Sequence, residues 1–250
     1  MLAPEVIAIL ARGILFTVML TAVTSVFSLT LGVLVGIMRL WGRPIPRLLA
    51  STYVDIFRNI PALVLIIFFA FAIPNLFPLE FRQSLFFDNV FAEWAGIISG
   101  LSLPYYALAA VVALTLNSSA YLAELFRAGV RTIPMEHVDA ARSLGATPKV
   151  VWRQILIPQG VRAAFPAITT RLIHNMKNTA LVSFVAVPEF FHSTQAAITR
   201  TFMAVEILLL AAIVYLILSV IFAWLLGQIG RRLDTRPRLN QLAQQGLTAL

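Results

Sequence analysis

Residues 13–38 read GILFTVMLTAVTSVFSLTLGVLVGIM, and no charged residue lies between Arg12 and Arg39. A transmembrane helix needs about 20 consecutive, mostly apolar residues, so this stretch is long enough to cross a bilayer. It is longer than the apolar core of a signal peptide, and no basic region precedes it. We therefore predict a first membrane-spanning helix here, preceded by a short external segment at residues 1–11.

The composition of the whole chain extends this interpretation. Of the 250 residues, 60% are hydrophobic and only 12% are charged, whereas soluble domains are about half apolar and about a quarter charged. A soluble fold of this composition would expose large apolar patches. The long, uniformly apolar runs also exclude a β-barrel, whose strands alternate. The sequence predicts an all-α polytopic membrane protein with one domain at about residues 12–230. The absence of cysteine excludes disulfides, thiolate metal sites and cysteine nucleophiles.

Four further segments are long and apolar enough to span a bilayer. They lie at about residues 60–77, 104–126, 163–187 and 205–229. The intervening residues 78–101 are only moderately apolar, and we expect an interfacial helix at 85–101. No internal repeat is apparent, so a two-fold transport pathway would require a second subunit.

The distribution of charge predicts the orientation. Basic residues dominate segments 39–47, 127–162 and 231–250, which follow the first, third and fifth apolar segments. Acidic residues outnumber basic ones in segment 78–99. Because basic loops stay in the cytoplasm, we predict an external N-terminus, a cytoplasmic loop at 130–160 and a cytoplasmic tail at 231–250. The net charge of +8 is then explained by cytoplasmic segments and not by nucleic-acid binding.

The predicted loop contains two short helices. Residues 132–160 read TIPMEHVDAARSLGATPKVVWRQILIPQG. Pro134 suits the first turn of a helix, and Gly145 can adopt the left-handed conformation that ends one. Pro148 would open a second helix, which we expect to end at Pro158.

The first of these helices has a surface suited to protein docking. Two alanines and a glycine give it little side-chain bulk, and its acids lie toward the positive end of the helix dipole. The candidate docking residues are Glu136, Asp139, Ala140, Ala141, Arg142 and Gly145. The alternative is a connector that simply lies on the membrane surface.

The spacing in this loop resembles that of a known motif. Asp139-Ala140-Ala141, Gly145 three residues later, and Ile155-Leu156-Ile157-Pro158 nine residues after that resemble the EAA motif of ABC-importer permeases. The consensus of that motif is Glu-Ala-Ala, three residues, Gly, nine residues and Ile-x-Leu-Pro. The resemblance covers about residues 12–230 and implies a five-helix permease core.

This resemblance implies a set of partners. In that family the loop is a coupling helix that docks into a separate ATP-binding cassette subunit, and ATP and Mg are bound there and not by the permease. A second permease subunit, identical or homologous, and an external substrate-binding protein complete such an importer. The implied location is the inner (plasma) membrane of a bacterium.

Three other segments resemble the polar-amino-acid permeases. Residues 53–61 are similar to the Tyr-Val-Glu-x-Phe-Arg-x-x-Pro segment of that subfamily, and residues 114–124 are similar to the segment before its coupling loop. Residues 176–181 read MKNTAL, where the subfamily commonly has Leu-Lys-Asp-Thr-Ser-Leu. With Asn178 in place of Asp, the chain looks most like the glutamate/aspartate branch.

Lys177 lies near the middle of the fourth apolar segment. A charge at this depth is costly unless it faces water or a partner, and such residues are candidate functional groups. We expect Lys177 to contact a substrate carboxylate. The predicted pathway residues are Asn117, Ser118, Tyr121, Lys177, Asn178 and Thr179.

Several of these polar residues have alternative, structural interpretations. Asn117 and Ser118 could be hydrogen-bonding contacts between helices. Glu124 and Arg127, like Asp55 and Arg58, could simply form ion pairs at the membrane surface. His174 is more simply explained as a packing residue than as a ligand.

The chain lacks catalytic motifs. It contains no G-x-x-x-x-G-K-[ST] loop, so it cannot hydrolyse ATP by that route, and it has no G-x-S-x-G or H-E-x-x-H motif. Its histidines have no metal-ligand spacing. We therefore expect a non-enzymatic subunit without a metal or cofactor of its own. The competing classes are a membrane-embedded enzyme and an ATP-independent carrier or channel for small polar solutes.

Overall fold

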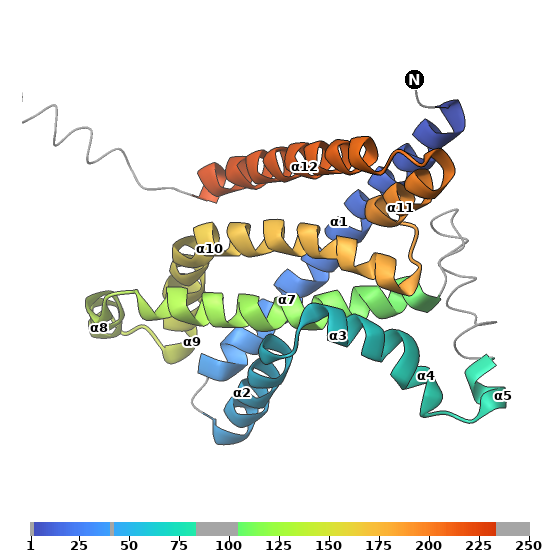
Figure 1. Cartoon of the computed structure of the whole chain (residues 1–250). Helices are drawn as coiled ribbons and strands as arrows, with labels where there is room; N and C mark the ends of the chain where they lie inside the picture. Colours follow the sequence, from blue (N-terminus) through green and yellow to red (C-terminus); the bar gives the residue numbers. More distant parts are fainter. Residues whose placement is uncertain (1–2, 41–42, 84–104, 234–250) are drawn as a thin grey trace, which may run out of the picture.

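The computed structural model describes residues 3–40, 43–83 and 105–233, and within them the chain forms helices and no strands (Figure 1). The all-α class is confirmed. The elements are α1 (Pro4–Leu40), α2 (Pro44–Asn59), α3 (Ala62–Ile67), the π-helix η1 (Phe68–Ala72), α4 (Ile73–Asn75), α5 (Leu79–Arg82), α7 (Tyr105–Arg131), α8 (Met135–Ser143), α9 (Pro148–Val150), the π-helix η3 (Val151–Leu156), α10 (Ile157–Asn178), the 3-10 helix η4 (Thr179–Val185), α11 (Phe190–Thr201) and α12 (Ala204–Leu233).

The long apolar segments correspond to helices of the structure. Among the described residues, α1, α7 and α12 are each long and apolar enough to cross a membrane. The second predicted segment is the later part of a broken span, because α2 meets the helical stretch 62–75 at an angle of 102°. The fourth predicted segment corresponds to α10 and η4 and does not reach the same apolarity. Arg171 and Lys177 interrupt its apolar character.

The break between α2 and α3 has a local cause. Pro61 has no backbone N–H, so it cannot donate the hydrogen bond that would continue α2. Ile60 accordingly has extended backbone angles, φ −88° and ψ 130°, and α3 begins at Ala62. The chain therefore turns sharply at the position where sequence analysis placed the start of a straight helix.

The prediction that Pro158 ends the second loop helix is wrong. α9, η3 and α10 follow one another without an interruption, and Leu156 retains helical backbone angles. Pro158 lies in the first turn of α10. The preceding π turn explains this tolerance, since a widened turn changes which carbonyl faces the residue that lacks an N–H.

The far end of the predicted fourth segment is irregular. After Asn178 the α-helix tightens into η4, and Ala186 then adopts the left-handed conformation with φ 58°. α11 follows as a short helix that packs against α1 and α12 (Figure 1). The short 3-10 turn lets the chain reverse direction within a few residues.

Small residues allow α7 to pack closely between its neighbours. A Cβ atom at Gly32 of α1 would lie only 2.7 Å from the Cβ of Leu122 on α7. A Cβ at Gly129 of α7 would lie 2.6 Å from the carbonyl oxygen of Gly160 in α10. In lipid the hydrophobic effect does not bring helices together, so close van der Waals packing between small residues holds them instead.

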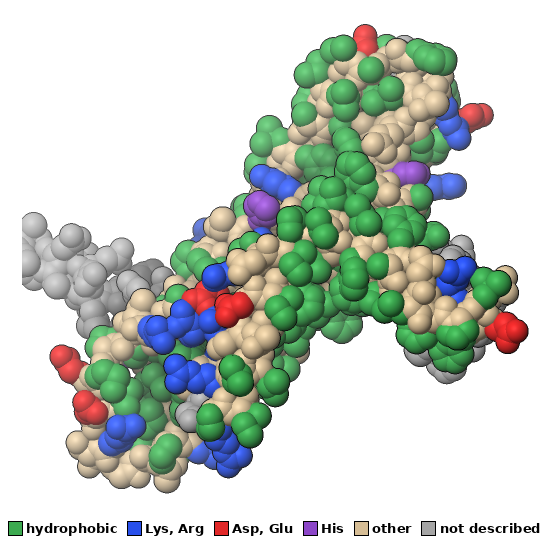
Figure 2. Space-filling model, turned by 60° about the horizontal axis from the view of Figure 1, so that its bottom comes forward, with side chains coloured by type: hydrophobic (Ala, Val, Ile, Leu, Met, Phe, Trp, Pro, Cys, Tyr) green, Lys and Arg blue, Asp and Glu red, His purple; other side chains and the backbone are tan. Residues whose placement is uncertain are grey.

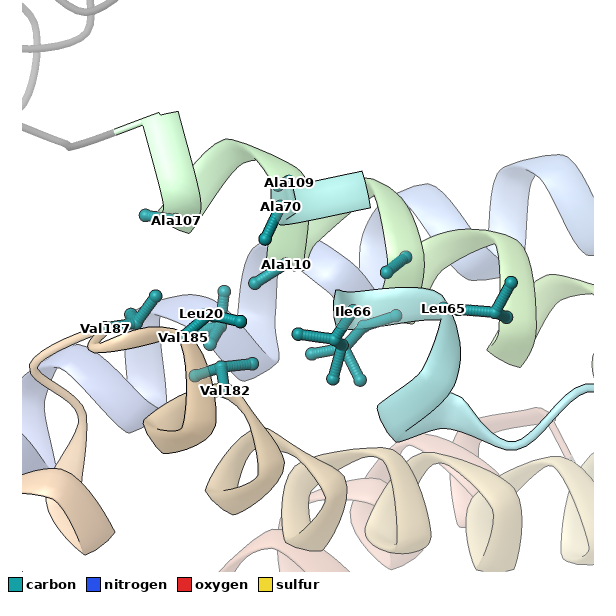
Figure 3. Packing of buried hydrophobic residues seen from close by; sticks show 12 residues of the cluster. Leu20, Leu65, Ile66, Ala70, Ala107, Ala109, Ala110, Val182, Val185 and Val187 are labelled. Carbon is teal, nitrogen blue, oxygen red and sulfur yellow. The ribbon is translucent and has the colours of Figure 1, made fainter. Parts of the chain in front are cut away.

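The apolar core lies where α1, α3, α7 and η4 converge (Figure 3). Leu20 and Ile66 contribute large side chains, and Ala110 contributes only a small side chain from α7. Val182 and Val185 anchor the irregular η4 turn in the same cluster. The core therefore holds the broken span and the 3-10 turn in place.

Much of the outer surface is apolar. On the face shown in Figure 2, hydrophobic side chains spread over a wide area, and many of the charged ones gather toward the lower left end. On α12, Leu209 and Leu216 are 60% and 63% exposed. Such a surface fits a lipid environment.

The remaining segment predictions are only partly covered. The external segment predicted at residues 1–11 overlaps α1, which begins at Pro4. The interfacial helix expected at 85–101 and most of the tail at 231–250 lie outside the described residues.

Candidate functional site

The loop between α7 and α10 presents α8 as a separate short helix. Gly145 has φ +82°, and its N–H donates to the Arg142 carbonyl at 2.9 Å while the Ala146 N–H donates to Ala141 at 3.0 Å. These two bonds form the glycine-terminated helix end that the sequence predicted. Pro134 immediately precedes the first helical residue instead of lying within the first turn.

The candidate docking residues lie on the outside of the molecule. Ala141 is half-buried, and the other five are exposed: Glu136, Asp139, Ala140, Arg142 and Gly145. Leu144 was not singled out from the sequence, yet it is 89% exposed, and Met135 is 64% exposed. Large apolar side chains next to the helix ends, at Met135 and Leu144, were the signal that could have identified them.

α8 contacts the neighbouring helical segments through a few side chains. Val138 is buried at 4% exposure, and His137 Nδ1 lies 3.1 Å from Gln159 Oε1 at the start of α10. Ile133, just before α8, packs in a cluster with Phe126 and Val130 of α7. The His137–Gln159 contact therefore links α8 to the start of α10, and Ile133 links the segment before α8 to α7.

A polar network lies deep inside the helix bundle. Asn117 of α7 donates to the carbonyls of Phe57 at 3.0 Å and Ile60 at 3.3 Å. The Phe57 carbonyl is free because its helical donor would be the N–H that Pro61 lacks. Tyr121 donates to the Arg58 carbonyl at 2.9 Å beside the same break. Side chains of α7 thus donate hydrogen bonds to the backbone carbonyls next to the break between α2 and α3.

Asn175 indicates the depth of this network. It accepts from Ser118 at 2.7 Å and donates to Thr24 at 2.9 Å. Ser118 and Thr24 lie near the centres of α7 and α1. Asn175 is therefore near mid-depth in the bundle. Lys177 is about 3 Å further along the helix axis, at 1.5 Å per residue.

Arg171 belongs to the same network and was missed by sequence analysis. Its Nη2 donates to Asn117 Oδ1 at 2.7 Å and to Ser118 Oγ at 3.2 Å. The guanidinium carbon lies 3.9 Å from the centre of the Tyr121 ring, a cation–π contact. Its Nε is buried without a hydrogen-bond partner among the described residues. A second cation six residues before Lys177 in a spanning segment was the available signal.

The other predicted pathway residues are dispersed around α10. Lys177 is exposed, and no hydrogen bond or ion pair to its ammonium is found in the described part of the chain. Asn178 is half-buried, whereas Thr179 is buried and donates to the Met176 carbonyl at 2.6 Å. His174 is exposed between Arg171 and Lys177, so the expectation that it packs in the core is wrong.

The structure thus assembles part of the predicted set. It brings Asn117, Ser118 and Tyr121 together around Arg171, with all three also holding helices together. For Asn117 and Ser118 this is the interhelical role given above as the alternative, whereas for Tyr121 it was not predicted. The role of all three in a pathway stays a prediction. Lys177 lies on the open side of the same helix as Arg171.

A charge cluster lies where α1, α2 and α7 meet. Glu124 pairs with Arg127, as one interpretation of the sequence had it, and also with Arg39 of α1. The expected Asp55–Arg58 pair is not found in the described residues, and Asp55 instead lies 4.0 Å from Arg39. The bend after α2 and the proximity of α1 redirect this carboxylate.

A buried carboxylate holds the opposite end of the bundle together. Glu189 is fully buried and accepts from Thr17 at 3.3 Å and from Tyr215 at 3.0 Å. It also accepts from the His192 N–H at 2.7 Å, which makes it the N-cap of α11. The three bonds link α1, α11 and α12. Its position after the fourth predicted segment gave no sign of this role.

The described residues contain no group of three or more histidine, cysteine or acidic side chains able to hold a metal ion. The candidate site has two separate parts. One is the exposed helix α8 at one end, and the other is the pair Arg171 and Lys177 near mid-depth on α10, which lie about 120° apart around the helix.

Comparisons with known proteins place this arrangement in a family. The family model described as "Binding-protein-dependent transport system inner membrane component" matches residues 28–235. The L-cystine transport system permease protein TcyL of Bacillus subtilis is 28% identical over 83% of this chain and 80% of its own length. The putative glutamine transport system permease protein GlnP of Rickettsia typhi is 27% identical over 89% of this chain and 91% of its own.

Solved structures share the fold. A crystal structure described as an amino acid ABC transporter with histidines has a TM-score of 0.73 and 25% identity, covering 91% of this chain and 95% of its own. The MetNI methionine ABC transporter in an inward-facing conformation has a TM-score of 0.68 at 21% identity, covering 93% of this chain and 100% of its own, and supports the fold alone. With most of its length matched by the family model, the chain belongs to the binding-protein-dependent transport system inner membrane components.

Proposed function

We propose that the chain is the membrane-spanning subunit of an ATP-driven importer of polar amino acids, with acidic amino acids as its substrates. The observation that carries the substrate class is the pair of cations, Arg171 and Lys177, near mid-depth on α10. Relatives named for glutamine and cystine transport support amino acids as the wider class.

Two cations of α10, Arg171 and Lys177, favour a substrate that carries a carboxylate. Arg171 contacts Asn117, Ser118 and Tyr121 but no acidic side chain, and its Nε has no partner among the described residues. Lys177 is exposed on the same helix. A carboxylate can pair with either cation, whereas a cationic substrate would be repelled. The two cations lie about 9 Å apart along α10 and about 120° apart around it, so each offers a separate position for a carboxylate.

The exposed α8 is the proposed coupling surface to a separate ATPase. Its charged residues can orient it in a cleft, and Leu144 supplies an apolar group able to anchor it. The proposed assembly contains two ATPase subunits, a second permease subunit and an external binding protein that delivers the substrate. ATP and Mg are bound by the ATPase, and this chain supplies no cofactor site.

Lys177→Met tests the substrate pathway. Lys177 is exposed in this chain, and the proposal is that it pairs with a substrate carboxylate. Loss of a charge pair that becomes buried when the partner binds costs about 2–5 kcal/mol, so we expect uptake of glutamate or aspartate to fall about thirtyfold or more. Basal ATPase activity and assembly should be unchanged. The measurement is uptake of labelled glutamate, aspartate, glutamine and arginine by cells carrying the variant. Lys177→Arg is the control that retains the charge.

Asn178→Asp provides an independent check of the same proposal. A carboxylate next to Lys177 should weaken acidic uptake and raise the relative uptake of glutamine or arginine. An unchanged preference in this variant, or a Lys177→Met complex that falls apart, would contradict the pathway role.

The proposed orientation has the N-terminus outside and both α8 and the tail in the cytoplasm. The chain has no native cysteine, so a cysteine introduced at position 145 would be its only thiol. Labelling would then report on the accessibility of that position alone. We expect an impermeant thiol reagent to label it in inverted vesicles and not in intact cells. Labelling from outside intact cells would reverse the assignment.

A further inference from the structure

A cavity of about 920 Å³ lies between the start of α10, the end of α12 and the loop before α8. These three segments lie at the same end of the molecule (Figure 1). The residues that give the cavity its chemistry are Gln159, Arg162, Phe165, Thr169 and Arg231. The volume is in the range of small-molecule sites, about 300–1,000 Å³.

The charges of this cavity have one sign. Arg162 and Arg231 enter the lining from α10 and α12, and no aspartate or glutamate among the described residues belongs to it. Both arginines are exposed, and no ion pair to either is found among the described residues. Gln159 and the hydroxyl of Thr169 add uncharged hydrogen-bonding groups, whereas the hydroxyl of Thr132 already donates to the Gly129 carbonyl at 2.8 Å. This donor set suits a phosphate group.

The cavity lies at the expected depth of a lipid headgroup. The apolar run of α12 extends from Ile207, after Glu206, to about Leu226, which corresponds to about 30 Å at 1.5 Å per residue. The hydrocarbon core of a bilayer is about 30 Å thick, so Gly227 and Arg231 lie at its edge. Phe165 and Pro166 supply apolar walls on the side toward the membrane interior.

We propose that this cavity binds the phosphate of an anionic phospholipid such as phosphatidylglycerol, with Arg162 and Arg231 as its ligands. Basic pockets between transmembrane helices are a recurring way to hold such headgroups. The apolar walls favour a lipid over a soluble phosphate, since they would contact its glycerol and first acyl carbons. This site is independent of the proposed transport function and of the α10 cations at mid-depth.

The test is a count of bound lipid by mass spectrometry. The full chain is purified in detergent micelles that contain equal amounts of phosphatidylglycerol and phosphatidylcholine. We expect the wild-type chain to retain phosphatidylglycerol preferentially. The double variant Arg162→Gln and Arg231→Gln should lose this preference by roughly tenfold or more, since each basic residue near a membrane surface contributes about 1 kcal/mol.

Matched variants separate the cavity from general surface charge. Arg153→Gln with Arg232→Gln removes the same charge from exposed arginines that do not line the cavity and should retain the preference. Gly227→Leu keeps both arginines but fills space, because a Cβ at Gly227 meets no atom within 4 Å, and it should also reduce binding.

Three outcomes would overturn the proposal. They are an unchanged preference in the Arg162→Gln and Arg231→Gln variant, an equal loss in the Arg153→Gln and Arg232→Gln control, and displacement of phosphatidylglycerol by millimolar inorganic phosphate. The last would identify a soluble anion as the ligand.

Discussion

Gly129→Leu is expected to prevent α7 and α10 from packing together. A Cβ at Gly129 would lie 2.6 Å from the Gly160 carbonyl oxygen and 2.9 Å from the Ala164 backbone nitrogen, so backbone on α10 would have to move. Overpacking that displaces backbone costs about 3 kcal/mol or more. The measurement is the fraction of protein that remains monodisperse after heating in detergent, and we expect it to fall sharply.

The effect should extend beyond stability. Arg171 reaches Asn117 and Ser118 only because α7 and α10 lie close together. Any folded remainder of Gly129→Leu should therefore be inactive in uptake. Gly129→Ala should be intermediate, since its Cβ makes the same close contact without the larger side chain.

Gly227→Leu is the matched control for this experiment. It adds the same side chain to another helical glycine, at a position where a Cβ meets no atom within 4 Å. Replacing a helical glycine also improves helix propensity by about 0.8 kcal/mol. Its thermal stability should equal or exceed that of the wild-type chain. Equal stability of Gly129→Leu and Gly227→Leu would contradict the packing argument.

Gly145→Asp is expected to abolish transport while the protein remains inserted in the membrane. Gly145 has φ +82°, yet a Cβ there meets no atom within 4 Å, and aspartate tolerates the left-handed region better than most residues. The fold should therefore persist. The variant places bulk and a negative charge on the proposed docking surface, next to Leu144.

The readouts are uptake of labelled amino acids and co-purification of the ATPase with the chain. Gly145→Asn is the control, because it has nearly the same shape and the same tolerance of φ > 0 but no charge. It should retain a larger fraction of the activity. Normal import by Gly145→Asp with the ATPase fully attached would show that α8 does not couple transport to ATP hydrolysis.

How much of the fold the sequence predicted depends on the kind of signal. Long apolar runs correctly predicted α1, α7 and α12, because burying a backbone in lipid leaves the helix as the available solution. Gly145 correctly predicted the end of α8 because glycine adopts the left-handed conformation readily, whatever its tertiary contacts. Proline was less informative. Pro61 breaks a span, whereas Pro158 lies in the first turn of a helix.

The candidate site was less predictable because it depends on contacts between distant residues. The sequence alone predicted that Lys177 lies within a spanning segment and showed that residues 139–158 resemble the EAA motif in their spacing. It could not show that Arg171 lies over Tyr121, because these residues are on different helices.

Tertiary structure decided that Asn117 serves the carbonyls freed by Pro61, and that Glu189 joins three helices. Both are consequences of a single physical requirement. A polar group removed from water must find its partner inside the protein, and the packing of the helices, not the local sequence, determines which partner is within reach.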